Sequence, residues 1–451
     1  MKGRARTVEV AVLGAGPAAV ATACALRRLG HTVRLFGRGR HHALEGLSVR
    51  ALALLEHYGL SVAAACATHP AARGGHWGGS PVSAGHEFIV DRRAFDHALR
   101  EDAAAHGVSL EEEFALAIEP AARGHRVRTR SGTHRAGVLI DARGRRGGRP
   151  QARGPSLIAL SQRLSAIPAS PPRTLICPLE DGWCWFASDG AGGAVLQLIV
   201  ASRGLARRAD PAQRLRECVA ALAVCESDLR CARLEGEPCA RAASARLSAP
   251  GTAPPGSLRA GDAAVAMDPL SGHGLYEALA WAGAASAAAH TWLEGRSWEP
   301  VERFLAERAR ERWSAGIALA AGFYRQQATA TPTAFWRHCA DAYAAQLAGL
   351  RASAGRPEGR WQLRPVLNGS VIEMRRVVVT EERPRGVWQV ERVELARLEE
   401  FFLAQPAADV PQAARYLARP PAAVASAVGW LRACGLLERD GKTPQERVVN
   451  R

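Results

Sequence analysis

An apolar run followed by closely spaced glycines sets the fold class of this chain. Residues Val8–Leu13 are apolar apart from Glu9, and Gly14, Gly16 and Ala19 follow them in the spacing G-x-G-x-x-[G/A]. Helix-forming residues then continue to Leu29. A strand, a tight glycine turn and a helix in this order allow backbone amides at the helix start to contact a pyrophosphate. The sequence therefore predicts a Rossmann-like α/β domain that binds a dinucleotide.

The second strand of this unit departs from the usual pattern. Thr32–Phe36 ends in Gly37 and Arg38, where an acid that binds the ribose is expected. An arginine at this place is typical of NADP sites, so the glycine turn alone leaves the dinucleotide open.

The segment 261–274, GDAAVAMDPLSGHG, favours FAD. Asp262 ends a strand and offers an acceptor to a hydroxyl of the sugar chain, while Gly261, Gly272 and Gly274 allow backbone amides to approach a flat ring. The helix expected at 275–290 would point its positive N-terminus at the ring and stabilise a negatively charged, reduced flavin.

Two further segments complete a pattern. Asp91, Arg92, Phe95 and Asp96 start an expected helix, D-R-x-x-F-D, and residues 138–145 read VLIDARGR. With GAGPAA and GDAAVAMDPLSGHG, the four ordered segments resemble the FAD-binding framework shared by aromatic hydroxylases and tryptophan halogenases. The resemblance covers about residues 8–330.

This resemblance implies an FAD site drawn from distant parts of the chain. Glu45 and Arg50 would also lie along the cofactor. The expected FAD-binding residues are Gly14, Gly16, Pro17, Ala18, Ala19, Glu45, Arg50, Arg92, Asp141, Gly144, Gly261, Asp262, Pro269, Gly272, His273 and Gly274.

Composition limits the remaining possibilities. The 451 residues are 47% hydrophobic, which suffices for a sizeable core. The net charge of +16 comes almost wholly from arginine and predicts a basic surface that attracts acidic partners. The ten cysteines lack a Cys-x-x-Cys pair, so we expect reduced thiols and no metal site. We expect no membrane span and a cytoplasmic location.

The predicted architecture is a discontinuous FAD-binding domain, residues 1–150 and 251–330, in which 65–95 contribute to the substrate side. Residues 151–250 contain alternating and apolar runs that predict an antiparallel sheet over the flavin. We expect a helical connector at 331–392 and a winged-helix-like module at 393–451. The single arginine within 421–434, Arg432, favours a protein partner over DNA for this module.

Halogenation is disfavoured. Halogenases of this superfamily require a lysine between flavin and substrate, and the only lysines here are Lys2 and Lys442. Ala266 and Gly272 also replace the Phe and Ser of the halogenase segment F-x-D-P-x-x-S-x-G. Hydroxylation requires a reduced flavin, oxygen, a pocket that excludes water and an electron-rich ring.

Within the superfamily, the chain resembles the flavoprotein monooxygenases of tryptophylquinone cofactor biogenesis, which act in the maturation of quinohaemoprotein amine dehydrogenase. The DPLSGxG ending, the segment HWGGS at 76–80 and the extra C-terminal module carry this resemblance. It implies that the substrate is a tryptophan of a small cross-linked polypeptide, the amine dehydrogenase small subunit, which the C-terminal module would help to dock. Molecular oxygen and an electron donor, for which NAD(P)H is a candidate, complete the reaction.

Candidate catalytic residues are His273 and Asp268. His273 could hydrogen-bond the flavin edge, help remove the ring proton after oxygen transfer, or be a loop histidine that faces solvent or the phosphate side. Asp268 either shapes the loop before Pro269 or acts as a general base, which would require a raised pKa. Trp77, Trp183 and Trp185 either line a substrate pocket or fill the core between sheet and helices.

Two other function classes stay open. One is a flavin-dependent reductase or dehydrogenase of a small or lipid substrate, because the same framework serves such enzymes. The other is a redox-responsive flavoprotein that binds nucleic acid through its C-terminal module.

Overall fold

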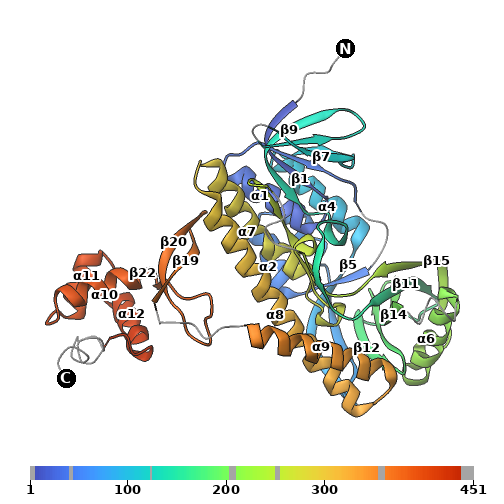
Figure 1. Ribbon diagram of the computed structural model, residues 1–451. Helices are drawn as coiled ribbons and strands as arrows, with labels where there is room; N and C mark the ends of the chain where they lie inside the picture. Colours follow the sequence, from blue (N-terminus) through green and yellow to red (C-terminus); the bar gives the residue numbers. More distant parts are fainter. Residues whose placement is uncertain are drawn as a thin grey trace. The chain divides into compact units, whose positions relative to one another are not determined.

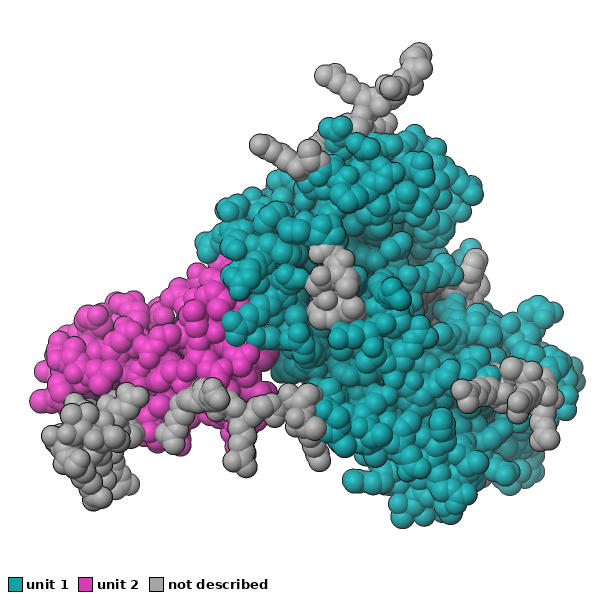
Figure 2. All heavy atoms as spheres, viewed as in Figure 1, with its two compact units in different colours: residues 1–353 teal, residues 354–451 magenta. Residues whose placement is uncertain are grey.

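The computed structural model describes residues 6–39, 44–121, 124–202, 210–248, 254–353 and 361–437. They belong to two compact units, residues 1–353 (unit 1) and 354–451 (unit 2), which Figure 2 shows in different colours. Each unit is described by itself.

The first sheet of unit 1 is mainly parallel. Its strands follow the order β6 (Ser109–Glu111), β2 (Val33–Phe36), β1 (Arg6–Leu13), β9 (Thr133–Asp141), β8 (His125–Arg128) and β7 (Ala117–Pro120), and β17 (Ser257–Arg259) also pairs with β9. The strands β6, β2, β1, β9 and β17 run parallel, while β7 and β8 are antiparallel. The predicted strands around Val138 and Leu258 therefore do join the N-terminal strand, as expected for a discontinuous domain.

Alanine-rich helices cover this sheet. The helices of the region are α1 (Pro17–Arg28), α2 (Val49–His57), α3 (Ser61–Ala64), α4 (Arg92–Ala105) and α7 (Gly274–Leu293). Helix α1 packs against α7 and α4, close to β1 and β9 (Figure 1). Ala21 of α1 and Ala285 of α7 are fully buried, and such small side chains allow two helices to approach closely.

The second sheet is mostly antiparallel, as predicted. Its order is β15 (Arg233–Ala242), β11 (Leu157–Ser165), β14 (Ala194–Ala201), β13 (Gly182–Ser188), β12 (Arg173–Leu179), β4 (Pro70–Trp77), β5 (Ser80–Asp91) and β3 (Leu44–Leu47). The strands β3, β4 and β5 come from the N-terminal part of the chain and extend the sheet beyond the predicted 151–250. Strands β12 and β4 meet in parallel.

Helices lie on both faces of this second sheet. On one face α6 (Pro211–Cys225) packs against β11 and β14 (Figure 1). On the other face α8 (Trp298–Ala330) and α9 (Ala334–Ser353) contact β13 and β12, because the Trp183 indole of β13 donates to the Tyr324 hydroxyl and the Trp336 indole of α9 donates to the Leu179 carbonyl of β12.

Short elements join the two sheets. They are a small sheet of β10 (Pro150–Arg153), β16 (Arg246–Ser248) and β18 (Val265–Ala266), and the 3-10 helices η1 (Gly144–Arg146), η2 (Ser227–Leu229), η3 (Gly261–Ala263) and η4 (Pro269–Ser271). The segment 261–274 therefore folds as η3, β18 and η4 before α7 starts.

Unit 2 corrects one prediction. Within the described part of 331–392, the expected helical connector is helical only in α9, because β19 (Trp361–Asn368) and β20 (Val371–Val378) form a hairpin. The two strands pair in antiparallel register from Trp361 with Val378 to Asn368 with Val371, and Val366, Ile372 and Val377 are buried.

The rest of unit 2 is a small helical bundle. After β21 (Gln389–Val390) and β22 (Val393–Glu394) come α10 (Leu395–Ala404), α11 (Val410–Leu417) and α12 (Pro421–Ala433), within the part of the chain for which the C-terminal module was predicted. Val424, Val428 and Leu431 share one buried face and join the core of this unit. The polar turn at 440–441, which would form the wing, lies outside the described residues.

Among the described residues, we find no helix long and apolar enough to cross a lipid bilayer.

A histidine pair joins the α1–β2 turn to the last turn of α7. His31 Nε2 lies 2.8 Å from His290 Nδ1, and His31 Nδ1 lies 3.4 Å from a Glu9 oxygen. Burial, and then the neighbouring His31, lower the pKa of His290. The neutral imidazole is therefore the form that the folded protein favours.

We expect this pair to make unit 1 acid-sensitive. A histidine with a lowered pKa contributes stability that is present above its unfolded pKa and is lost as pH falls through the folded value. Between about pH 8 and about pH 5, the melting temperature of the native protein should therefore fall more than that of His290→Gln. The exposed His338→Gln is the control and should follow the native protein. Parallel curves for all three proteins would contradict this expectation.

Candidate flavin-binding and catalytic site

The predicted glycine turn lies at the carboxyl ends of β1 and β9. Gly14 has a φ of +121°, and a Cβ on it would lie 2.3 Å from the Ala142 carbonyl oxygen. Gly16 is the N-cap of α1, and Pro17 occupies its first turn. A side chain at position 14 is thus excluded by conformation and by contact, so the glycine is required for folding itself.

Gly16 and Gly274 differ from Gly14 in a way that fits a bound cofactor. A Cβ on either would meet no heavy atom within 4 Å, and neither residue has a positive φ. The fold therefore does not require glycine there, whereas close approach of a ligand to the backbone does. The two glycines precede or start α1 and α7, whose N-terminal amides favour negative charge. The residues present fit the pyrophosphate and the flavin of FAD.

Asp262 and Asp141 lie on neighbouring segments. Asp262 is in η3, with one carboxylate oxygen 3.7 Å from Arg145 Nε. Asp141 ends β9 and receives two hydrogen bonds of 2.9 Å from the Arg143 guanidinium. Burial of Asp141 opposes its ionisation, but the hydrogen bonds and charge of Arg143 outweigh burial and lower its pKa. Of the two, Asp262 retains more exposure for a ligand hydroxyl.

The α1 start and η3 are in direct contact. A Cβ on Gly261 would lie 2.7 Å from the Ala18 Cβ, and Ala19 is fully buried. Gly144, the first residue of η1, has a φ of +63°. The segments GAGPAA, DARGR and GDAAVA therefore meet at one edge of the sheet, as the four-segment pattern predicts.

The fourth segment is anchored through Arg92. Its side chain is 3% exposed and forms ion pairs of 2.7 Å with Glu45 and with Asp96. Asp91 caps α4 by accepting bonds from the Arg93 and Ala94 amides. Glu45 and Arg92 thus lie together, as expected, while a third of the Glu45 side chain remains exposed.

At the end of β2, where the expected acid is missing, the end of strand β6 lies alongside. The amide of Gly37 donates to the Glu111 carbonyl, and Arg38 Nε donates to the Glu112 carbonyl at 2.8 Å. Strand β6 therefore brings Glu111 and Glu112 to the edge where the ribose of a dinucleotide usually binds.

The loop before α7, residues 267–274 (the flavin loop), is held by Asp268. This carboxyl is fully buried and accepts bonds from the Leu270 amide at 2.9 Å and from the Tyr343 hydroxyl at 2.5 Å. Tyr324 donates to it at 3.4 Å. Burial raises the pKa of Asp268. These contacts favour the loop-shaping role that the sequence offered for Asp268 beside the catalytic one.

His273 lies half-buried at the N-cap of α7, after Gly272 in the left-handed conformation. Arg50 donates a 2.6 Å bond to the Tyr276 hydroxyl and stacks over its ring. Burial lowers the pKa of His273, and the positive charges of Arg50, Arg73 and Arg312 add to this effect while Glu277 opposes it.

These arginines are held in place by acids. Arg312 forms a two-pronged ion pair with Glu277, and Arg73 Nε lies 3.3 Å from the buried Glu87. A Cβ on Gly272 would lie 3.4 Å from the Arg73 guanidinium. Glu277 and Glu87 offset the charges of Arg312 and Arg73, while the N-terminus of α7 and Arg50 add positive charge beside the flavin loop, which suits an anionic reduced flavin.

An aromatic cluster lies between β4, β13, α8 and α9. Trp77 is 5% exposed and packs edge-to-face against Trp336, with ring centroids 5.3 Å apart. Trp183 is 2% exposed and bonds to Tyr324, which stacks on Tyr343. Trp77 and Trp183 therefore fill the core between sheet and helices, whereas Trp185 is half-buried. A role in substrate binding stays a prediction for all three.

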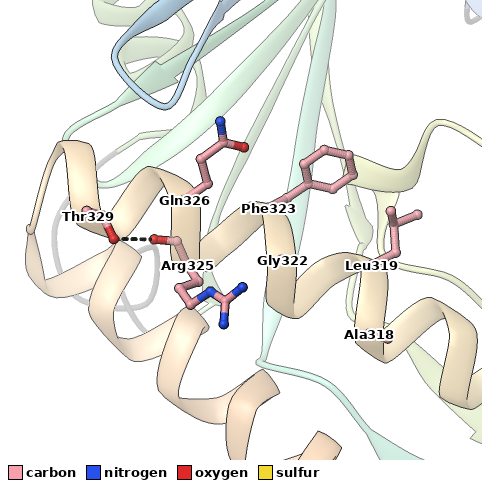
Figure 3. A pocket seen from close by; sticks show the side chains of 7 residues that line it. All are labelled: Ala318, Leu319, Gly322, Phe323, Arg325, Gln326 and Thr329. Atoms are coloured by element: carbon pink, nitrogen blue, oxygen red, sulfur yellow. Dashed lines mark hydrogen bonds between the residues drawn. The ribbon is translucent and has the colours of Figure 1, made fainter.

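A groove of about 470 Å³ follows one side of α8. Leu319, Phe323 and Gln326 project from this side of the helix (Figure 3). The β4–β5 turn lies beside it, because the Gly78 amide donates to Gln327 and the Trp77 indole donates to the Phe323 carbonyl. The other lining residues are Ala318, Gly322, Arg325 and Thr329.

Comparison with known proteins decides the family. The sequence matches no family model and no curated protein. Among solved structures, the peptidyl tryptophan dihydroxylase QhpG, essential for tryptophylquinone cofactor biogenesis, is 30% identical over 96% of this chain and 100% of its own, with a TM-score of 0.75. The chain belongs to the QhpG family. It is an FAD-dependent oxidoreductase of the aromatic hydroxylase and halogenase-like superfamily.

More distant structures share the fold. The flavin-dependent halogenase CmlS is 18% identical, with 98% of each chain covered and a TM-score of 0.72. Aklavinone-11 hydroxylase, solved with FAD and aklavinone, is 17% identical over 72% of this chain and 70% of its own, with a TM-score of 0.57.

Sequence reasoning missed several residues of this site. Arg73, Arg312 and Tyr276 surround His273, and Tyr324 and Tyr343 hold Asp268. Arg73 lies three residues before the HWGGS segment, but no spacing rule connects it to the flavin loop. Tyr276 could have been identified from the sequence, because it follows Gly274 by two residues in the first turn of α7.

Two glycine variants separate folding from cofactor binding. Gly16→Ala should leave the apoprotein melting temperature unchanged, because its Cβ meets open space, yet weaken FAD binding by about tenfold or more. Gly14→Ala should lower stability by several kcal/mol, because its Cβ collides with the Ala142 carbonyl. Calorimetry of the apoproteins and fluorescence titration with FAD measure both effects. Unchanged FAD affinity in Gly16→Ala would contradict the assignment of this turn.

Proposed function

We propose that the protein is a single-component FAD-dependent monooxygenase that hydroxylates a tryptophan side chain of a partner polypeptide during tryptophylquinone cofactor biogenesis. The observation that carries this proposal is the similarity to QhpG, which extends through both units rather than through the FAD-binding framework alone. The flavin loop and its arginines support the same reading.

The FAD-binding residues proposed from the sequence retain their roles. GAGPAA and the start of α1 would contact the pyrophosphate, Asp262 would accept a hydrogen bond from the sugar chain, and Gly272 and Gly274 of the flavin loop would lie next to the ring. When bound, FAD would supply the activation of oxygen and its transfer to an electron-rich indole. The chain itself orients the two partners and excludes water.

His273 is the proposed base for the proton of the attacked ring carbon. It lies on the flavin loop, and its lowered pKa keeps the imidazole neutral near pH 7, as a proton acceptor requires. Arg50 and Tyr276 hold the first turn of α7 beside it. Asp268 is fully buried and already accepts from two tyrosines and one amide, so we assign it to positioning of the loop.

A polypeptide substrate requires a broad approach, which the α8 groove offers. Gly316 of α8 contacts Met267 at the start of the flavin loop, and Gln326 and Gln327 reach the β4–β5 turn. We propose that the substrate segment enters along this helix and that Trp185 contacts it. The net charge of +16 would speed the encounter with an acidic partner.

Unit 2 is the proposed docking module for that partner. Exposed Tyr416 stacks on Phe401, with Arg397 over its ring, which gives unit 2 an aromatic and basic surface. NAD(P)H as electron donor and a cytoplasmic location stay predictions.

Halogenation and the other function classes have weaker support. The halogenases share the fold, but the chain has no lysine between Lys2 and Lys442. A reductase of a small or lipid substrate is the second candidate, since a geranylgeranyl bacteriochlorophyll reductase-like protein, 19% identical, also shares the fold.

Oxygen transfer to a polypeptide tests the proposal. The reduced protein, mixed with a cross-linked, tryptophan-containing small subunit and oxygen, should add one or two oxygen atoms to a single tryptophan, as read by peptide mass spectrometry. Free tryptophan should react poorly because it lacks the contacts along α8 and unit 2. Reduction of a small or lipid substrate without oxygen incorporation would overturn the proposal.

Replacement of His273 should lower the rate and alter its pH dependence. We expect His273→Gln to reduce kcat by about a hundredfold and to remove the acid limb of the profile, which should lie below the ordinary histidine pKa of about 6.5. Rates measured between about pH 5 and about pH 8 give both values. His338→Gln is the control with native behaviour. An acid limb that persists in His273→Gln would exclude this base.

A further inference from the structure

Three thiols and an imidazole gather on the α6 side of the second sheet. Cys177 of β12 lies directly opposite Cys184 of β13 in the antiparallel register. In the parallel pairing of β12 with β4, Ile176 lies opposite Gly75, so His76 comes next to Cys177. Cys218 of α6 belongs to the same buried cluster.

The register of the two strands suits a covalent bond. Directly opposite residues of an antiparallel pair have Cα atoms about 4.5 or about 5.5 Å apart. A disulfide requires a Cα separation of about 4.4 to 6.8 Å, so either type of pair satisfies it without backbone movement. Both residues project from the same face of the sheet, and their thiols lie within hydrogen-bonding reach of each other.

The two thiols are chemically unequal. The hydrogen bond from Cys184 lowers the pKa of Cys177, and His76 lowers it further against the effect of burial. Hydrogen bonds to Cys177 and Cys218, and then burial, raise the pKa of Cys184. By contrast, burial raises the pKa of Cys24 and of Cys339 to about 12. Cys177 is therefore the more reactive nucleophile of the pair. The neighbouring Cys184 thiol can react with the oxidised form of Cys177 to give a disulfide.

Access from solvent also differs. Cys177 retains 9% of its surface, whereas Cys184 has none. His76 is exposed and contacts Cys177 from the β4 side. A small oxidant therefore reaches Cys177 first, at the rim of the cluster.

We propose that Cys177 and Cys184 form a reversible disulfide, with His76 activating Cys177 and hydrogen peroxide as the oxidant. The Cys177 thiolate attacks one peroxide oxygen, the O–O bond breaks, and the departing hydroxide takes a proton to leave as water. The Cys184 thiol then attacks the sulfur of the Cys177 sulfenic acid, forms the S–S bond and releases a second water. The two thiols lose two electrons in total, and peroxide gains them.

The disulfide would lie on the face of β13 opposite to the aromatic cluster. Cys184 stands between Trp183 and Trp185, whose side chains point to the opposite face of β13. A link between β12 and β13 would thus fix the strand that carries both tryptophans. Reduced flavin that meets oxygen without substrate would supply the peroxide; this source rests on the proposed function, while the disulfide itself does not.

Peptide mapping after peroxide treatment tests the site. The full-length protein is exposed to a small excess of hydrogen peroxide, blocked with N-ethylmaleimide and digested. Cleavage at Glu180 separates the two cysteines, so the disulfide is detected as a linked peptide pair that dithiothreitol divides. We expect this pair to form before any other, and Cys184→Ser to leave Cys177 as a sulfenic acid that dimedone captures.

The activating role of His76 has a separate readout. Cys177 should react with iodoacetamide near pH 7 about tenfold more slowly in His76→Gln than in the native protein. Cys239→Ser, on an exposed residue of β15, is the control and should leave both measurements unchanged. Linked peptides that exclude Cys177, or oxidation of exposed Cys231 and Cys239 while the pair stays reduced, would overturn the proposal. So would an unchanged alkylation rate in His76→Gln. None of these outcomes bears on oxygen transfer to tryptophan.

Discussion

The structure of unit 1 depends on the close packing of three chain segments at the carboxyl ends of β1 and β9. Gly14 passes so near the Ala142 carbonyl that only glycine fits, and Gly261 passes equally near Ala18 of α1. A Cβ on Gly16 would meet no heavy atom within 4 Å, so these contacts leave space beside the start of α1. The same packing that closes the core therefore creates the place where a pyrophosphate is bound by helix amides.

A second constraint, the buried carboxyl of Asp268, connects the flavin loop to the second sheet. Asp268 is fully buried, and a buried carboxyl is tolerated only when hydrogen bonds compensate for its lost hydration. Tyr343 from α9 and Tyr324 from α8 supply them, and Trp183 of β13 bonds to Tyr324 in turn. The flavin loop is thus tied to both long helices and to the second sheet.

Local sequence was sufficient for the parts of the fold in which one segment determines its own structure. The strand, glycine turn and helix at 8–29 and the capped helix after Asp91 were predicted correctly, as were β11 to β14. Contacts between distant segments were beyond such reasoning. Nothing near Arg92 in the sequence indicates that Glu45 pairs with it, although family resemblance placed both along FAD.

Other features depended on tertiary packing. The β19–β20 hairpin was mistaken for part of a helical connector, because short alternating runs next to Pro365 and charged residues give a weak strand signal. Tyr324 and Tyr343 are ordinary helix residues until α8 and α9 bring them to one carboxylate. The pairing of Cys177 with Cys184 likewise exists only in the register of β12 and β13.

We propose that distant segments of unit 1 together bind one FAD. The most direct measurement is equilibrium binding of FAD to the purified apoprotein, followed by the absorption spectrum of the complex. We predict one FAD per chain, bound without a covalent link and released on denaturation. Failure of the folded protein to bind FAD at any concentration tested would contradict the proposed FAD site.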